Sequence, residues 1–173
     1  MYEPSIAVGA RRWLAIAIAL TLLTASGCGF KLRGALELPP GQNTLYVNAP
    51  SDVYLEIGNF LEGSQAKVVG SPDGASVILN VTSATYDRRV LTVDPDTGKE
   101  REFELSLNVR FNALDGDGKT LVDAQSVTLL RDYVFDSDAV IGASREEVVL
   151  RREMLRDAVQ QLLLRLRSAI ENA

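Results

Sequence analysis

The stretch FELSLNVRF, residues 103–111, constrains the fold of this 173-residue chain more than any other. Apolar and polar residues alternate along it without a break, and the apolar positions are Phe103, Leu105, Leu107, Val109 and Phe111. Successive side chains of a β-strand point to opposite faces of the sheet, so the alternation predicts a strand with one buried and one solvated face. A sheet of such strands needs a second layer over its apolar face.

Other stretches predict the remaining strands. TLYVNA (44–49) alternates in the same way, and AKVV (66–69) is short and apolar. Residues 75–93 are rich in β-branched side chains, but their alternation changes phase near Ser83, which predicts a β-bulge. The turn sequences DPDTGK and DGDGK flank the first strand described, and a further strand follows at 121–133. The three long strands are therefore expected to be antiparallel neighbours.

Two stretches predict helices. Ser51 can act as the N-cap of a helix that runs to about Ser64. Ser144 and Glu147 have the spacing of a capping box, and a long amphipathic helix follows it. The apolar positions of this second helix are Val148, Leu155, Val159, Leu162, Leu166 and Ile170. They could bind a membrane surface or a partner helix, but a one-sided sheet needs a cover, and we favour that role.

The order of these elements is strand, helix, short strand, three long strands and helix. It predicts an α+β fold, a two-layer sandwich in which two helices pack on one face of a mixed, mostly antiparallel sheet. The opposite sheet face, which carries Glu104 and Asn108, is expected to be open to solvent or to a partner.

The N-terminal residues predict an export signal. Arg11 and Arg12 precede a thirteen-residue apolar run, WLAIAIALTLLTA. A membrane-spanning helix needs about 20 apolar residues, so the run is too short to span a bilayer but suits a cleaved signal. The small residues before Cys28 resemble the lipobox of bacterial lipoproteins, which implies cleavage before Cys28 and acylation of that residue. The paired arginines leave the general secretion and twin-arginine routes both open.

Cys28 is the only cysteine of the chain. A lone exported thiol has no internal partner in an oxidising compartment, and acylation would remove its reactivity; a buried free thiol is the alternative. We therefore predict a cleaved signal peptide at 1–27, a lipidated tether at 28–43 and one domain at 44–173. Gly29 follows the cysteine instead of the aspartate that retains lipoproteins in the inner membrane, so the resemblance implies the outer membrane.

Composition argues against several function classes. The chain has 23 acidic and 18 basic residues, and this net negative charge disfavours nucleic acid as a partner. It has no histidine, so the usual general base and the commonest metal ligand are both missing. We therefore expect no enzyme activity, no metal and no cofactor beyond the acyl chains on Cys28.

Three stretches together resemble the LptE family of Gram-negative outer-membrane lipoproteins that assemble lipopolysaccharide. GCGFKLRG (27–34) is similar to the start of the mature protein in that family, and TGKEREFELSLNVRF (97–111) to its central hairpin. Residues 129–166 are similar to its last strand, loop and helix. The resemblance implies two helices on a four-stranded sheet.

The resemblance also implies a function. Members of the family sit as a plug in a 1:1 complex inside the large β-barrel LptD, facing the periplasm and the barrel lumen. There they assist assembly of the barrel and delivery of lipopolysaccharide to the cell surface. A small non-catalytic adaptor lipoprotein of another envelope complex is the alternative that the residues leave open.

Basic side chains near the hairpin tip and before the last helix bind lipopolysaccharide in relatives. This chain has Asp96 and Ala143 at those positions, with basic residues close by. The resemblance therefore makes these the candidate lipopolysaccharide-binding residues: Arg88, Arg89, Lys99, Arg101 and Arg145. Guanidinium groups can engage phosphates through paired hydrogen bonds. The alternative is that these cations form cross-strand ion pairs with the acidic residues interleaved among them.

Overall fold

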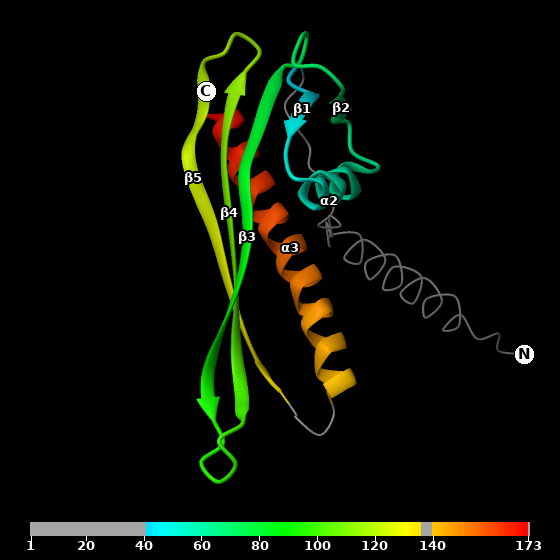
Figure 1. Cartoon of the computed structure of the whole chain (residues 1–173). Helices are drawn as coiled ribbons and strands as arrows, with labels where there is room; N and C mark the ends of the chain where they lie inside the picture. Colours follow the sequence, from blue (N-terminus) through cyan, green and yellow to red (C-terminus); the bar gives the residue numbers. More distant parts are fainter. Residues whose placement is uncertain (1–40, 136–139, 173) are drawn as a thin grey trace, which may run out of the picture. The chain divides into compact units, whose positions relative to one another are not determined.

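The computed structural model describes residues 41–135 and 140–172, and Figure 1 shows their arrangement. Five strands form one sheet in the order β2-β1-β3-β4-β5. The elements in chain order are β1 (Thr44–Asn48), α2 (Ser51–Leu61), β2 (Lys67–Val69), β3 (Val77–Val93), β4 (Glu100–Asp115), β5 (Thr120–Val134) and α3 (Val140–Glu171). Cys28 and the predicted signal peptide lie outside the described residues, so the proposed lipid anchor and the boundaries at 27 and 43 stay predictions.

The expectation of a four-stranded, mostly antiparallel sheet needs correction. The short stretch 67–69 pairs with β1 as a fifth strand, and β1 is parallel to both β2 and β3. Only the pairs β3–β4 and β4–β5 are antiparallel. The helix between β1 and β2 accounts for the first of these parallel pairs, because a helical crossover returns the chain to the same end of the sheet.

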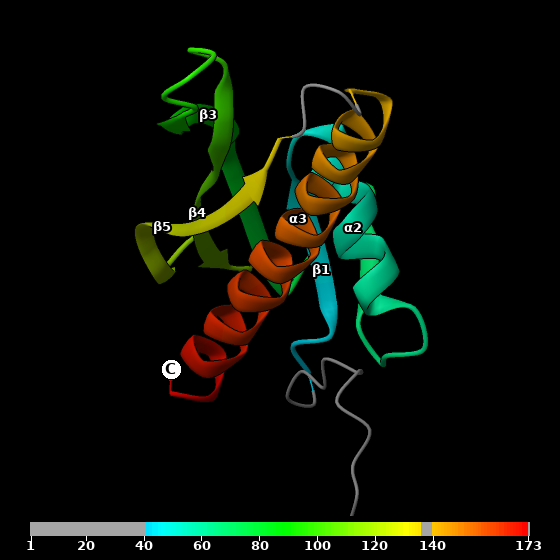
Figure 2. The ribbon, with the colours of Figure 1, turned by 90° about the horizontal axis from the view of Figure 1, so that it is seen from below.

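Both helices cover the same face of the sheet, as Figures 1 and 2 show together. The five apolar residues of 103–111 are at most 2% exposed, in agreement with the predicted one-sided strand. They share one core with residues of α2 such as Ile57 and residues of α3 such as Leu162 and Leu166, all fully buried. The predicted α+β sandwich with two helices on one sheet face is therefore confirmed.

The bulge predicted near Ser83 is also present. The register of β3 against β4 shifts between Val81 and Ser83. Beyond the shift, Tyr86 pairs with Leu107 and so lies on the helix-covered face. The extra residue thus keeps the apolar side chains of both halves of β3 on one side of the sheet.

The predicted helix starts are wrong at both helices. Pro50 precedes α2 and its carbonyl already accepts a hydrogen bond from the amide of Tyr54 at 2.8 Å, so Ser51 is the first helical residue. Helix α3 begins at Val140, four residues before Ser144, so Ser144 is not its N-cap. A local capping pattern fits any helical position, and here the helix extends through it.

Val148 departs from the predicted apolar stripe of α3, because 56% of it is exposed. The neighbouring residue Glu147 faces the sheet instead, where it contacts Tyr133. One residue turns a helix by about 100°, so both side chains cannot face the sheet. The other five predicted stripe residues are buried.

We expect Leu107→Ala to lower the free energy of unfolding by about 2 to 5 kcal/mol, because the side chain is 0% exposed and its loss leaves a cavity. Asn108→Ala is the matched control on the adjacent residue of β4, whose side chain lies on the open face and donates to Thr128 Oγ1 at 2.8 Å. It should cost far less. Urea unfolding of both variants measures the difference, and equal losses would contradict the one-sided sheet.

Candidate functional site

The hairpin of β3 and β4 ends in an arm that we define as residues 87–103. Every residue from Asp87 to Val93 is exposed, and Figure 1 shows the arm running past the first turns of α3. The turn at its tip is closed by a hydrogen bond from the amide of Asp94 to the carbonyl of Lys99 at 2.8 Å. Gly98 has a φ of 68°, a backbone conformation that favours glycine.

The Asp94 carboxylate is part of the turn. Its Oδ1 accepts hydrogen bonds from the amide and hydroxyl of Thr97, both at 2.9 Å, and from the amide of Asp96 at 3.1 Å. These bonds, with those from Thr97 the strongest, lower the pKa of Asp94. The carboxylate therefore stabilises the turn from within.

Arg88 and Arg89 point to opposite faces of the arm, as neighbours in a strand must. Arg89 lies on the open face and donates from Nε and NH2 to the two oxygens of Glu104, at 2.6 and 3.1 Å. Arg88 lies on the helix-covered face, 4.4 Å above the ring centre of Phe103. The two neighbouring arginines of the hairpin therefore lie on two different faces of the arm.

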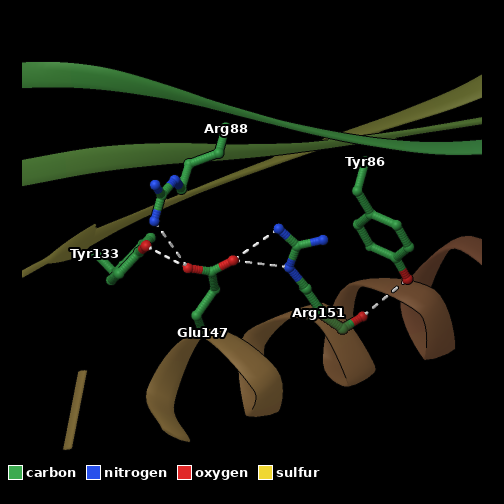
Figure 3. A network of polar contacts seen from close by, with 5 residues as sticks. All are labelled: Tyr86, Arg88, Tyr133, Glu147 and Arg151. Atoms are coloured by element: carbon green, nitrogen blue, oxygen red, sulfur yellow. Dashed lines mark hydrogen bonds and ion pairs between the residues drawn. The ribbon is translucent and has the colours of Figure 1, made fainter. Parts of the chain in front are cut away.

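Arg88 joins a cluster of polar contacts centred on Glu147, which we call the Glu147 cluster (Figure 3). Glu147 Oε2 accepts from the Tyr133 hydroxyl at 2.7 Å and from Arg88 NH1 at 3.4 Å. Its Oε1 accepts from Nε and NH2 of Arg151 at 2.9 and 2.7 Å. Tyr86 completes the cluster by donating to the Arg151 carbonyl at 3.2 Å. Strands β3 and β5 are thus tied to one turn of α3.

The charges of this cluster are mutually stabilising. Partial burial raises the pKa of Glu147, but hydrogen bonds from Tyr133 and Arg151 and the charges of Arg151 and Arg88 outweigh it, so the net pKa is lowered. Burial, followed by the hydrogen bond to Glu147, raises the pKa of Tyr133. Both shifts favour an ionised Glu147 that accepts from a neutral tyrosine.

Aromatic rings pack beside the cluster at the base of the arm. Phe103 stacks on Tyr133 with ring centres 5.6 Å apart, and Phe135 meets Phe103 edge-on at 5.6 Å. Such pairs stabilise beyond the area they bury. The base of the arm is therefore held by apolar and polar contacts together.

The other three candidate cations are exposed as well. Lys99 and Arg101 lie on the β4 side of the tip, and Arg145 lies in the second turn of α3. Asp96 is in the exposed tip, whereas the side chain of Ala143 lies outside the described residues. Sequence reasoning missed Tyr133 and Arg151 as partners of Glu147, although the i,i+4 spacing of Glu147 and Arg151 is a signal for an ion pair.

Two negative findings concern the described residues alone. Their acidic side chains form no group of three or more that could hold a metal ion. None of their helices is long and apolar enough to span a membrane.

The LptE family, described by the term lipopolysaccharide-assembly, matches residues 35–166. The chain belongs to the LptE family. It is 28% identical over 160 residues to the LPS-assembly lipoprotein LptE of Pectobacterium atrosepticum, covering 90% of this chain and 85% of the relative. It is 27% identical over 160 residues to LptE of Yersinia enterocolitica, with 90% and 75% coverage.

Solved structures share the fold. The chain is similar to lipoprotein B of Nitrosomonas europaea, with a TM-score of 0.65 and 32% identity over 78% of this chain and 88% of that one. It is also similar in fold to the rare lipoprotein B of Shewanella oneidensis, with a TM-score of 0.66 and 24% identity over 75% and 98% of the two chains. The LptE resemblance noted in the sequence is therefore confirmed.

The lowered pKa of Glu147 predicts a pH dependence of stability. A carboxylate with a depressed folded-state pKa stabilises the fold above its unfolded-state value, here 4.5, and this contribution is lost as the pH falls through the folded-state pKa. We expect Glu147→Gln to lower the melting temperature at neutral pH, and the difference from wild type to shrink below about pH 4.5. Thermal unfolding between pH 3 and 7 measures this.

Glu146→Gln is the matched control, because Glu146 is the adjacent residue of α3 and is exposed. It removes the same charge without touching Tyr133 or Arg151. A gap between wild type and Glu147→Gln that stays constant across the pH range would show that the carboxylate charge does not contribute.

Proposed function

We propose that this chain is a lipid-anchored outer-membrane protein that assists assembly of an LptD-like β-barrel and delivery of lipopolysaccharide to the cell surface. The observation that most directly supports this function is the family match over residues 35–166, which spans nearly the whole α+β domain. In this proposal Cys28 carries the acyl chains, and the domain sits as a plug in a 1:1 complex with the barrel. The protein acts by binding and has no catalytic role.

The open face of the sheet supports the plug role. Two of its rows are uncharged and polar, with the exposed Arg110 between them: Asn48 donates to Asn80 at 3.4 Å, and Asn108 to Thr128 at 2.8 Å. The interior wall of a large outer-membrane barrel is polar and hydrated. The amides and hydroxyls of this face can bind such a wall through direct and water-mediated hydrogen bonds.

The hairpin arm supports contact with lipopolysaccharide. Val90 pairs with Phe103 on the helix-covered face and is 40% exposed, and Arg101 lies two residues before Phe103 on the same strand. Arg101 therefore shares that face, next to an apolar surface. An amphiphile with phosphates and acyl chains fits a surface where cations and apolar side chains lie together.

We also rank the five candidate cations by their contacts. Arg88 and Arg89 are held by the carboxylates of Glu147 and Glu104. A ligand phosphate would have to displace those carboxylates. Arg101 shares the arm face that carries the exposed apolar side chain of Val90, and Arg145 is exposed on α3, so we assign these two the larger share of binding and test Lys99 of the tip with them.

Co-purification tests the proposed function directly. A tagged full chain extracted from outer membranes in detergent should bring down a large β-barrel protein in a 1:1 ratio. Isolation with peptidoglycan-bound or inner-membrane proteins in place of a barrel would support the adaptor alternative. Isolation with no partner would contradict both readings.

A triple variant tests the ligand site. Lys99→Gln, Arg101→Gln and Arg145→Gln together should weaken binding of purified lipopolysaccharide by roughly tenfold at low salt, because each exposed contact is modest, and less at high salt. The matched control, Lys67→Gln with Arg110→Gln and Lys119→Gln, removes the same charge from exposed positions off the arm. Equal affinity of the two variants would refute the arm as the site while leaving the plug role intact.

A further inference from the structure

Strand β5 lies at the edge of the sheet, with β4 on one side only. The amide of Phe135, directly after β5, donates to the Arg101 carbonyl of β4 at 2.7 Å. Backbone groups of alternate residues point to the same side of a strand, so residues 127, 129, 131 and 133 also face β4. The N–H and C=O groups of Ser126, Thr128, Leu130, Asp132 and Val134 therefore point outward, and we call them the outer edge of β5.

This outer edge is long enough to pair with another strand. The register of β5 on β4 is regular from Gln125 to Val134, without the shifts that disturb its first residues. The strand contains no proline and no lysine, the residues that commonly blunt sheet edges. Leu130 and Val134 are 52% and 59% exposed, so the edge presents apolar side chains as well as outward backbone groups.

Two arginines cover carbonyls of the outer edge. Arg165 of α3 donates from NH1 to the carbonyl of Ser126 at 3.0 Å and to Gln125 Oε1 at 3.1 Å. Arg131 donates from NH1 to the carbonyl of Leu130 at 3.1 Å, while its NH2 donates to Asp157 of α3 at 2.9 Å. Each guanidinium thus binds a carbonyl of the outer edge and also a side chain, Gln125 for Arg165 and Asp157 for Arg131.

We propose that Arg131 and Arg165 prevent the outer edge of β5 from pairing in an antiparallel manner with β5 of a second copy of this chain. A pairing centred on Thr128 would place Ser126 of one copy opposite Leu130 of the other. The carbonyls of Ser126 and Leu130 would then both accept from amides of the second copy. The two arginines already bond these two carbonyls, so both side chains compete with the same strand pairing.

The strand is suited to pair with itself in this register. Thr128 would face Thr128, Leu130 would face Ser126, Asp132 would face Ala124 and Arg131 would face Gln125. No like charges meet, and threonine and leucine pairs are favourable across strands. The proposal stands independently of the proposed function, because it concerns only the edge and its arginines.

The experiment compares masses of the full chain purified in detergent, by size exclusion with light scattering. Wild type should be monomeric, and Arg131→Ala with Arg165→Ala should shift toward the dimer as concentration rises. Adding Thr128→Pro should restore the monomer, because it removes the central outward N–H, and proline is tolerated where that N–H faces solvent. A double variant that stays monomeric at every concentration at which it remains soluble overturns the proposal.

Two controls test whether dimerisation results from the uncovered edge and not from loss of positive charge or from misfolding. Arg152→Ala with Arg156→Ala removes two exposed arginines of α3 away from this edge, and it should stay monomeric. Circular dichroism checks folding; if the double variant is unfolded, the single variants are compared, each expected to dimerise more weakly than a folded double variant but above wild type. Dimerisation of the control, or dimerisation that Thr128→Pro leaves unchanged, also overturns the proposal.

Discussion

Burial of the apolar face of β4 under α3 is the contact on which the rest of the structure depends. Phe103, Leu105, Leu107, Val109 and Phe111 are each at most 2% exposed, and α3 supplies fully buried residues from Met154 to Leu166 above the sheet. The sheet alone would leave this face in water, and α3 alone would expose its own apolar side. Each layer therefore requires the other, and the second face of the sheet is left available for polar contacts.

The hairpin arm extends this arrangement beyond the core. A two-stranded ribbon is marginally stable by itself in water, so an arm with exposed side chains needs anchoring at its base. Phe103, Tyr133 and Phe135 provide an apolar anchor, and Glu147 provides a polar one that joins β3, β5 and α3. The arm can thus present its tip in a defined direction although few apolar contacts support the tip itself.

Much of the fold was predictable because its signals are local. Alternation over residues 103–111 predicted the one-sided strand, and the phase change near Ser83 predicted the bulge, since both follow from the period of two along a strand. Strand β2 was only a short apolar run, and its parallel pairing depends on a crossover that no local pattern records. Glu147 was assigned to a helix cap from spacing alone, whereas its partners Arg88 and Tyr133 lie 59 and 14 residues away.

The same distinction between local pattern and contacts across the fold applies to the proposed ligand site. Arg88 and Arg89 are adjacent in sequence, yet a strand sends them to opposite faces, where Glu147 and Glu104 hold them. Arginine also bonds to backbone carbonyls at the edge of β5, and it is the cation in the ion pairs with Glu147, Glu104 and Asp157. A planar guanidinium with several donors suits such internal tasks, so an arginine near a turn is weaker grounds for ligand binding than its charge suggests. In the proposed ligand site we therefore expect most from cations on a face that also offers apolar surface, and strand geometry, together with the partners across the fold, determines which face each cation occupies.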